Sequence, residues 1–261
     1  MGHSNKSYFL LLFALILPAH FSTSMAGVSV SVSVDVAPPP LPDYEQPVCP
    51  DAGYMWQPGY WAYGSDGYFW VPGIWVLAPQ PGFLWTPGYW GWSGGVYVWN
   101  EGYWGRHVGY YGGVCYGFGY TGVGFYGGRW NHGVYYYNRS VANVNVTVVH
   151  NVYAKTVIKS PAISRVSYNG GTGGTLAKPT AKELVAVREK HIPPTVQQSQ
   201  HMQSAGANHA FLASTNHGQP SRADLAKHAA ATNQFSRTRE PSIRYSQPQH
   251  DPRSHWQRQG R

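Results

Sequence analysis

The sequence predicts a mainly β protein: an antiparallel meander of short strands rich in aromatic residues and glycine, followed by a few helices and a disordered basic tail. A segment of eight residues built on tryptophan, proline and glycine occurs four times, and the first tryptophans of successive copies lie 14, 15 and 14 residues apart. Such a short, fixed period predicts repeated structural units that pack on one another. After residue 178 aromatic residues become rare and helix-capping motifs appear.

The first 26 residues are typical of a secretory signal peptide. Lys6 supplies a positive charge, residues 8–17 form an unbroken apolar run, and Ser24-Met25-Ala26 offers small residues for cleavage. An apolar run of ten residues is shorter than the ~20 that span a bilayer as a helix. We therefore expect cleavage near Ala26, no transmembrane span in the mature chain, and export to the periplasm, the outer-membrane surface or the medium. No cysteine lies at the cleavage site, so lipidation is not expected.

Residues 27–53 are expected to form a strand and a proline-rich linker. Val28 to Val36 places valine at every second position, mostly alternating with serine, which predicts a strand with one apolar face. Ala37 to Pro50 contains six prolines and favours an extended polyproline segment.

Residues 54–168 are the predicted aromatic β-repeat domain. Each unit begins with an aromatic residue, any residue and tryptophan, and alternation along a strand puts both large side chains on one face. The Pro-Gly pair that follows suits the two central positions of a type II turn. Glycine-rich loops between units, such as 64–67 and 93–95, are typical of hairpins. The four copies are residues 54–61, 68–75, 83–90 and 97–104, the last with Glu101 in place of proline.

The remainder of this domain is less regular. Residues 110–133 are rich in glycine and tyrosine without a strict period, so they either continue the sheet with glycine bulges or form a flexible aromatic loop. Val141 to Val149 alternates valine with asparagine and threonine, which predicts a half-buried strand. Thr156 to Val166 is a further candidate strand.

The C-terminal third changes in character. Residues 169–178 are a predicted flexible glycine-rich linker, 179–235 a helical segment and 236–261 a disordered basic tail. Thr180 and Glu183 have the spacing of a capping box, which marks the start of a helix. The predicted helices run from this box to about His191, from about 195 to 214 with a stop at 216–218, and from about 221 to 232.

Charge is distributed unevenly. The chain carries a formal net charge of +8; residues 139–261 hold 16 Lys and Arg against 5 acids, or +11, whereas residues 43–138 hold 2 against 5, or −3. The basic tail could contact anionic lipid or surface polymer. Nucleic acid is not expected as a partner because an exported protein seldom meets it.

The repeated Tyr-x-Trp-x-Pro-Gly-x-Trp blocks resemble the YXWGXW (WXXGXW) repeat family of exported bacterial proteins, whose function is uncharacterised. The repeat covers residues 54–104, and further segments resemble the architecture of its uncharacterised members: 113–128, 137–153, 168–177 and 213–220. The resemblance implies an exported location and a β-repeat fold. Some family members are lipoproteins that accompany contact-dependent growth-inhibition systems, but this chain lacks the lipidation cysteine. The family brings no catalytic residues.

No catalytic or cofactor-binding constellation stands out. Ser65 and Ser93 lie in predicted turns, and Asp66 and Glu101 in predicted loops, so neither a hydrolytic triad nor a pair of glycosidase carboxylates is indicated. The tail histidines are spread without tight ligand spacing, so no metal or cofactor is predicted. These histidines are His191, His201, His209, His217, His228, His250 and His255.

The aromatic array is the one candidate site. Each tryptophan can pack in the core, where aromatic pairs add ~0.5–1.5 kcal/mol beyond area burial, or form a surface that stacks on sugar or grips peptide. Alternation predicts that one set is buried and the other exposed. The candidate ligand-stacking residues are the second tryptophans and three preceding tyrosines: Trp61, Trp75, Trp90, Trp104, Tyr60, Tyr89 and Tyr103. Cys49 and Cys115 can form a disulfide in an oxidising compartment or remain thiols, since sequence does not fix their distance.

These features predict an exported, non-catalytic structural or interaction protein of the bacterial envelope that acts through its Trp/Tyr repeat. Its expected partner is an envelope glycan or another envelope protein, which the sequence does not identify. A glycan- or cell-wall-binding module is one alternative, and it requires exposed tryptophan rings along one face. An accessory to an outer-membrane secretion or contact-dependent inhibition system is the other.

Overall fold

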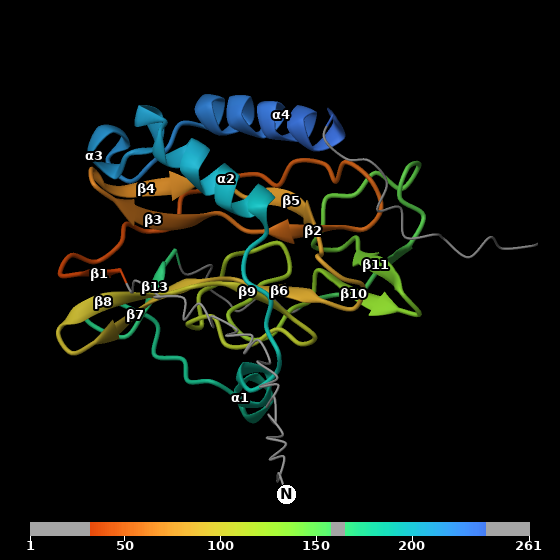
Figure 1. Cartoon of the computed structure of the whole chain (residues 1–261), viewed down its shortest axis with the longest axis horizontal. Coiled ribbons are helices and arrows are strands. Elements are labelled where there is room, and N and C mark those ends of the chain that lie inside the picture. Colours follow the sequence, from red (N-terminus) through yellow and green to blue (C-terminus); the bar gives the residue numbers. More distant parts are fainter. Residues whose placement is uncertain (1–31, 158–164, 239–261) are drawn as a thin grey trace, which may run out of the picture. The chain divides into compact units, whose positions relative to one another are not determined.

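The computed structural model describes residues 32–157 and 165–238, with side chains as far as residue 230. The described residues all lie in one compact unit, residues 31–261. The predicted signal peptide, most of the candidate strand at 156–166 and residues 239–261 of the tail lie outside the described ranges. The predicted fold class is confirmed, because the structure consists mainly of short strands in small antiparallel sheets, with a few helices (Figure 1).

The four repeat units form eight short strands, two from each unit. In the first half β3 pairs with β4, and β2 pairs with β5, both antiparallel. The register is continuous, since Gln57 lies opposite Ile74 and Tyr60 opposite Val71. The first two repeat units therefore form one long hairpin with a break in both of its strands. The third and fourth units form a second hairpin of the same kind. The strands are β2 (Tyr54–Gln57), β3 (Tyr60–Gly64), β4 (Gly67–Val71), β5 (Ile74–Leu77), β6 (Leu84–Thr86), β7 (Tyr89–Ser93), β8 (Val96–Asn100) and β9 (Tyr103–Gly105).

The Pro-Gly pairs are not type II turns, and that prediction is wrong. A type II turn needs a positive φ at its glycine, but Gly59, Gly73 and Gly88 are not among the glycines with positive φ. In the first hairpin the register puts Pro58-Gly59 opposite Pro72-Gly73, where the break occurs. Proline has no N–H to donate to the ladder, so the pairs interrupt the hairpin without reversing it.

The chain reverses at the predicted glycine-rich hairpin loops. Ser65-Asp66 joins β3 to β4, and Gly67 follows with a φ of 93°. Gly94 and Gly95 join β7 to β8 with φ values of 60° and 91°. Two successive positive φ values are the geometry of the type I′ turn that matches strand twist.

Short strands from distant parts of the chain extend the sheets. Strand β1 (Ser33–Val34) pairs with β8, and β13 (Tyr168–Asn169) runs parallel to β7, so the order of that sheet is β1-β8-β7-β13. Strands β10 (Gly128–Asn131) and β11 (Val134–Asn138) form a hairpin, and β12 (Val152–Tyr153) lies parallel to β11.

Residues 141–149 form turns, so the strand predicted there is wrong. The Asn145 side chain accepts a hydrogen bond from the backbone N–H of Thr147 at 3.0 Å. The backbone carbonyl of Asn145 accepts from the backbone N–H groups of Val148 and Val149. Asparagine side chains compete with ladder bonds in this way. Val146 and Val148 are exposed, so the alternation does not mark a buried face.

In the glycine- and tyrosine-rich stretch 110–133, residues 110–127 form an irregular loop that packs into the core, and residues 128–131 form β10. Isolated bridges link Tyr120 to Gly117 and to Phe125. Buried tyrosine hydroxyls tie the loop to the repeats: Tyr116 donates to the Gly88 carbonyl at 2.6 Å, and Tyr120 to the Trp85 carbonyl at 2.8 Å. The residues of 169–178 also make defined contacts, since Asn169 donates to Thr175 and Ala177.

The capping box predicted at Thr180 is present and starts α1 (Ala181–Val187), and a second capping box, formed by Thr195 and Gln198, starts α2 (Val196–Gly206). The second predicted helix ends earlier than residue 214, because Asn208 caps a short 3-10 helix (His209–Phe211) before α3 (Ala213–Asn216). His217 and Gly218 then adopt positive φ, at the predicted stop. Helices α2 and α3 pack on β4, and α4 (Arg222–Thr238) packs on β5 (Figure 1).

Candidate functional site

The eight repeat tryptophans form four cross-strand pairs, each joining the first tryptophan of one unit to the second of another. In every pair the two residues are direct register partners, and the ring centroids are 5.3–5.4 Å apart. Tilted and edge-on contacts at this distance are favourable aromatic geometries. The pairs are Trp56–Trp75, Trp61–Trp70, Trp85–Trp104 and Trp90–Trp99.

The second tryptophans lie in the core, with at most 2% of each exposed, so they do not form the predicted stacking surface. Their indole N–H groups donate to distant segments: Trp61 to the Pro40 carbonyl at 3.1 Å and Trp75 to the Pro47 carbonyl at 2.8 Å. The proline-rich segment thus covers a face that local alternation would leave open. Trp90 donates to the Trp61 carbonyl and Trp104 to Gln198, both at 2.8 Å.

The glycine of each unit makes room for the first tryptophan of its partner unit. A Cβ on Gly59 would overlap the ring of Trp70, and one on Gly73 would overlap the ring of Trp56. In the second hairpin a Cβ on Gly102 would lie 2.6 Å from the Trp85 ring and 2.7 Å from the Gly88 backbone nitrogen. Real Cβ atoms essentially never approach heavy atoms this closely. The repeated Trp and Gly positions are therefore two halves of one packing contact.

Comparison with known proteins gives this contact a family context. A family model described as the WXXGXW repeat matches two copies in this chain, residues 52–76 and 81–104. The chain carries the WXXGXW repeat. Each matched copy contains two of the four sequence units and corresponds to one interrupted hairpin. No curated protein and no solved structure matches the chain.

The three tyrosines in the predicted site are half-buried, and each packs against another aromatic ring of the protein. Tyr60 of the first WXXGXW copy lies nearly parallel to Trp99 of the second, with ring centroids 5.2 Å apart. Tyr103 stacks on His191, and Tyr89 meets Tyr110 edge-on. Burial raises the pKa of all three tyrosines, so they stay neutral and act as packing groups.

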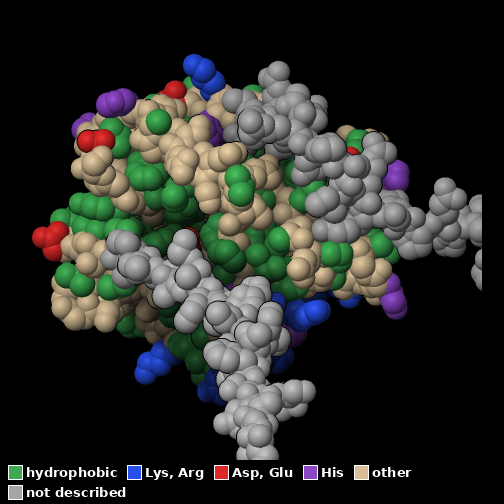
Figure 2. All heavy atoms as spheres, viewed as in Figure 1, with side chains coloured by type: hydrophobic (Ala, Val, Ile, Leu, Met, Phe, Trp, Pro, Cys, Tyr) green, Lys and Arg blue, Asp and Glu red, His purple; other side chains and the backbone are tan. Residues whose placement is uncertain are grey.

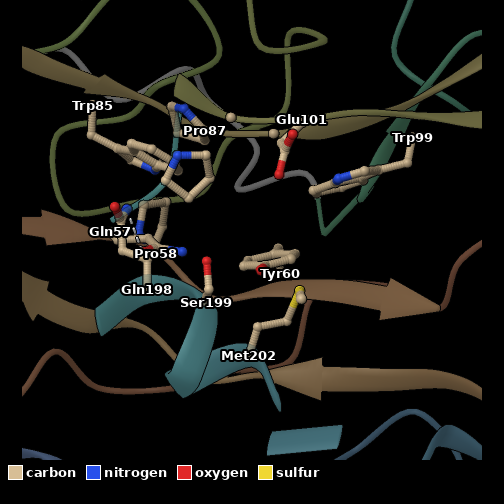
Figure 3. Close-up of a pocket in the computed structure, with 13 residues that line it drawn as sticks. Gln57, Pro58, Tyr60, Trp85, Pro87, Trp99, Glu101, Gln198, Ser199 and Met202 are labelled. Carbon is tan, nitrogen blue, oxygen red and sulfur yellow. Dashed lines mark hydrogen bonds between the residues drawn. The ribbon is translucent and has the colours of Figure 1, made fainter. Parts of the chain in front are cut away.

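The two WXXGXW copies and α2 enclose a small pocket of about 50 Å³ (Figure 3). Tyr60, Trp99 and Met202 line it, and the side chain of Glu101 points into it. A pocket of this size holds one or two water molecules and is too small for a sugar ring. Gln198 stands at its edge and bridges the copies, accepting from Trp104 and donating to the Gln57 side chain at 2.8 Å. Hydrophobic side chains flank a hollow on the face shown in Figure 2.

A much larger cavity of about 570 Å³ lies outside the hairpin pairs. The described residues of its walls come from the proline-rich segment 41–46, the loop 115–121 and residues 139–143, with Val157 and Arg165. This cavity is not predictable from local sequence patterns, because its walls come from segments that lie far apart in the chain. The sequence offers one local signal, since Phe118 stands between two glycines; in the structure its φ is 49°.

Cys49 and Cys115 are unpaired thiols, so the structure does not contain the disulfide considered above. The Cys49 thiol is buried and donates to the Asp51 carbonyl at 3.1 Å, with the Tyr137 hydroxyl at 3.8 Å. Burial raises the pKa of this thiol to about 12, which makes it unreactive. Cys115 is half-exposed and lines the large cavity.

The described residues contain no group of three or more His, Cys, Asp or Glu that could hold a metal ion. Asp66 accepts a hydrogen bond from the neighbouring Ser65 hydroxyl at the tip of a hairpin, and both residues are exposed. Among the helices that the structure describes, none is long and apolar enough to cross a membrane.

Proposed function

We propose that this protein is an exported, non-catalytic structural or interaction protein of the bacterial envelope that acts through its WXXGXW copies. The observation that supports this most strongly is the arrangement of the eight repeat tryptophans, which pair inside the molecule. Seven of the eight rings are buried, and Trp99 is half-buried against Tyr60, so the rings stabilise a platform instead of offering a row of indole faces to a sugar. The platform then offers its outer surface to a partner protein.

Export is inferred from the N-terminal sequence alone. A charged residue, an apolar run and a small-residue cleavage site occur in the order that signal peptidase substrates share. Expression of the full chain in a Gram-negative host, followed by fractionation and N-terminal mass mapping, tests this inference. We expect a mature N-terminus at Gly27 outside the cytoplasm, and retention inside when Leu12→Arg interrupts the apolar run. A full-length cytoplasmic product from the native sequence would refute export.

A glycan-binding role remains the second candidate, but on different residues from those predicted. Trp92 and Tyr63 sit on the inner hairpin strands, with exposed fractions of 42% and 39%. Exposed aromatic rings are what a sugar-stacking surface requires. Trp92 packs on Tyr97 at 4.7 Å between ring centroids, so one face is already supported.

Intrinsic tryptophan fluorescence with a panel of cell-wall and surface polysaccharides separates the two candidates. For a structural protein we expect blue-shifted emission and a flat titration with every polysaccharide. A saturable change that Trp92→Ala abolishes, with an unaltered urea midpoint, would favour the glycan role and refute the primary proposal. Trp75→Ala is the contrasting variant, since loss of a buried ring should unfold the protein whichever role is correct.

A further inference from the structure

We propose that α1 and the residues on either side of it form a docking surface for bilayers that contain anionic phospholipid. This α1 surface consists of the exposed residues between 176 and 190. It lies outside both WXXGXW copies, and Figure 1 shows α1 on the opposite side of the molecule from α3 and α4. The inference therefore goes beyond the platform role proposed above and does not depend on it.

Helix α1 turns its apolar residues outward. Helices on the surface of globular proteins usually bury their apolar stripe, but the two buried residues of α1 are Glu183 and Ala186. Four large apolar side chains of the α1 surface are 87%, 48%, 60% and 53% exposed, in the order Leu176, Leu184, Val185 and Val187. Valine also disfavours a helix because it is β-branched. Exposed apolar residues that lie together mark protein or membrane interaction sites.

Contacts on the inner side of α1 fix this orientation. The backbones of Trp104 in β9 and Ile192 exchange two hydrogen bonds, at 2.8 Å and 2.9 Å. Nδ1 of His107 lies 2.6 Å from the carboxylate of Glu189, which follows the helix. The helix cannot rotate its apolar side chains toward the core without breaking these contacts. The outward apolar face is therefore a fixed feature of the fold.

Positive charge surrounds the apolar side chains. Four exposed basic residues flank them: Lys178, Lys182, Arg188 and Lys190. None of the four forms an ion pair with any residue in the described ranges. The two acids between residues 176 and 190 are engaged within the protein, Glu183 in its capping box and Glu189 with His107. Figure 2 shows Lys and Arg side chains along the lower edge of the molecule, on the side where Figure 1 places α1.

An anionic bilayer matches both properties of this surface. Interfacial helices bury apolar side chains at the headgroup boundary while their basic residues face anionic lipid. A second copy of the chain would bring cations against cations, which is unfavourable. Protein interfaces are enriched in aromatic residues and depleted in lysine, whereas the α1 surface is aliphatic and contains three lysines. A neutral bilayer would leave the basic residues without counter-charges.

The test is flotation of the purified full chain with vesicles of phosphatidylcholine alone, or with phosphatidylglycerol as a quarter of the lipid. In low-salt buffer we expect binding to the anionic vesicles at least tenfold tighter than to the neutral ones. The triple variant Leu184→Gln, Val185→Gln, Val187→Gln should bind at least tenfold more weakly, because it keeps every charge but removes the apolar groups. The matched control is Val146→Gln with Val148→Gln, at valines that are 46% and 51% exposed. This control should bind like the native chain.

A second pair of variants tests the charges. Lys182→Gln on α1 should weaken binding about fivefold, whereas Lys227→Gln, at an exposed lysine of α4, should leave it unchanged. All of these positions are exposed, so the urea midpoints should stay the same.

Equal binding of the triple variant and the native chain would assign the binding to other parts of the chain, such as the basic tail, and would overturn the proposal. So would equal binding to the two kinds of vesicle, or none to either. Sedimentation analysis covers the remaining occupant: a dimer that the triple variant converts to a monomer would show that a second copy, and not a bilayer, covers the α1 surface.

Discussion

Substitution of Gly102 by alanine tests the proposed reason for the repeated glycine. An added Cβ would lie 2.6 Å from the Trp85 ring and 2.7 Å from two backbone atoms, the Gly88 nitrogen and the Thr86 carbonyl oxygen. A ring can shift, but opposing backbone in a paired hairpin cannot shift without breaking the pairing. We therefore expect a loss of about 3 kcal/mol in the free energy of unfolding, the upper end of the overpacking range.

Urea denaturation followed by tryptophan fluorescence measures this loss, and thermal unfolding should show a melting temperature lower by about 6–12 °C for a chain of this size. Gly64→Ala is the matched control. It lies in β3 with a φ outside the positive range, and its added Cβ would meet only the end of the Phe69 ring, at 3.3 Å. We expect a change of about 0.5 kcal/mol or less there. Equal destabilisation by the two variants would refute the packing explanation.

Three further predictions concern buried polar groups. Trp104→Phe keeps an aromatic ring but removes a 2.8 Å hydrogen bond to α2, so it should lower the free energy of unfolding, measured by urea denaturation, by about 2 kcal/mol. Trp92→Phe, at an exposed tryptophan, should lower it by about 0.5 kcal/mol. Equal effects of the two variants would contradict this prediction. Burial lowers the pKa of His201 to about 4, whereas the same histidine in the unfolded chain takes up a proton below about pH 6.5. The stability that comes from keeping His201 neutral is therefore fully present above pH 6.5 and is lost as the pH falls to 4. The unfolding free energy should thus fall by about 3 kcal/mol over that window, and His201→Gln should flatten the profile. A disulfide reagent should label Cys115 in the native protein and Cys49 only in urea; rapid labelling of both would show that Cys49 is accessible.

Features set by neighbouring residues could be predicted from the sequence. The capping box predicted at Thr180 has the expected geometry, because a cap needs only residues three positions apart. The glycine-rich hairpin loops are also where the chain reverses. The turn assigned to Pro-Gly is wrong because the requirement for Gly59 and Gly73 is not local. It comes from tryptophan rings on the opposite strand.

The candidate site could be predicted only in part, for a similar reason. Alternation along one strand predicts a buried and an exposed set of rings, yet Trp56 and Trp61 are both buried. The second face is covered by Pro40 and Pro47, which belong to a segment whose composition suggested only a linker. Tryptophan spacing contains no information about which distant segment will accept an indole N–H. The large cavity that Gln46 lines is not predictable for the same reason, since its walls converge only in the fold.

The smallest structural unit of this repeat is a pair of sequence units. Each first tryptophan needs the glycine of the opposite unit, and each tryptophan pair takes one ring from either strand. A single unit would expose both of its rings and leave its glycine without function. The family model aligns with residues 52–76 and 81–104, each a complete pair. The contact predicts that stable chains with this repeat contain even numbers of units. It also explains why Glu101 can replace a proline while the neighbouring glycine stays: the break tolerates another residue, but the space for the Trp85 ring does not.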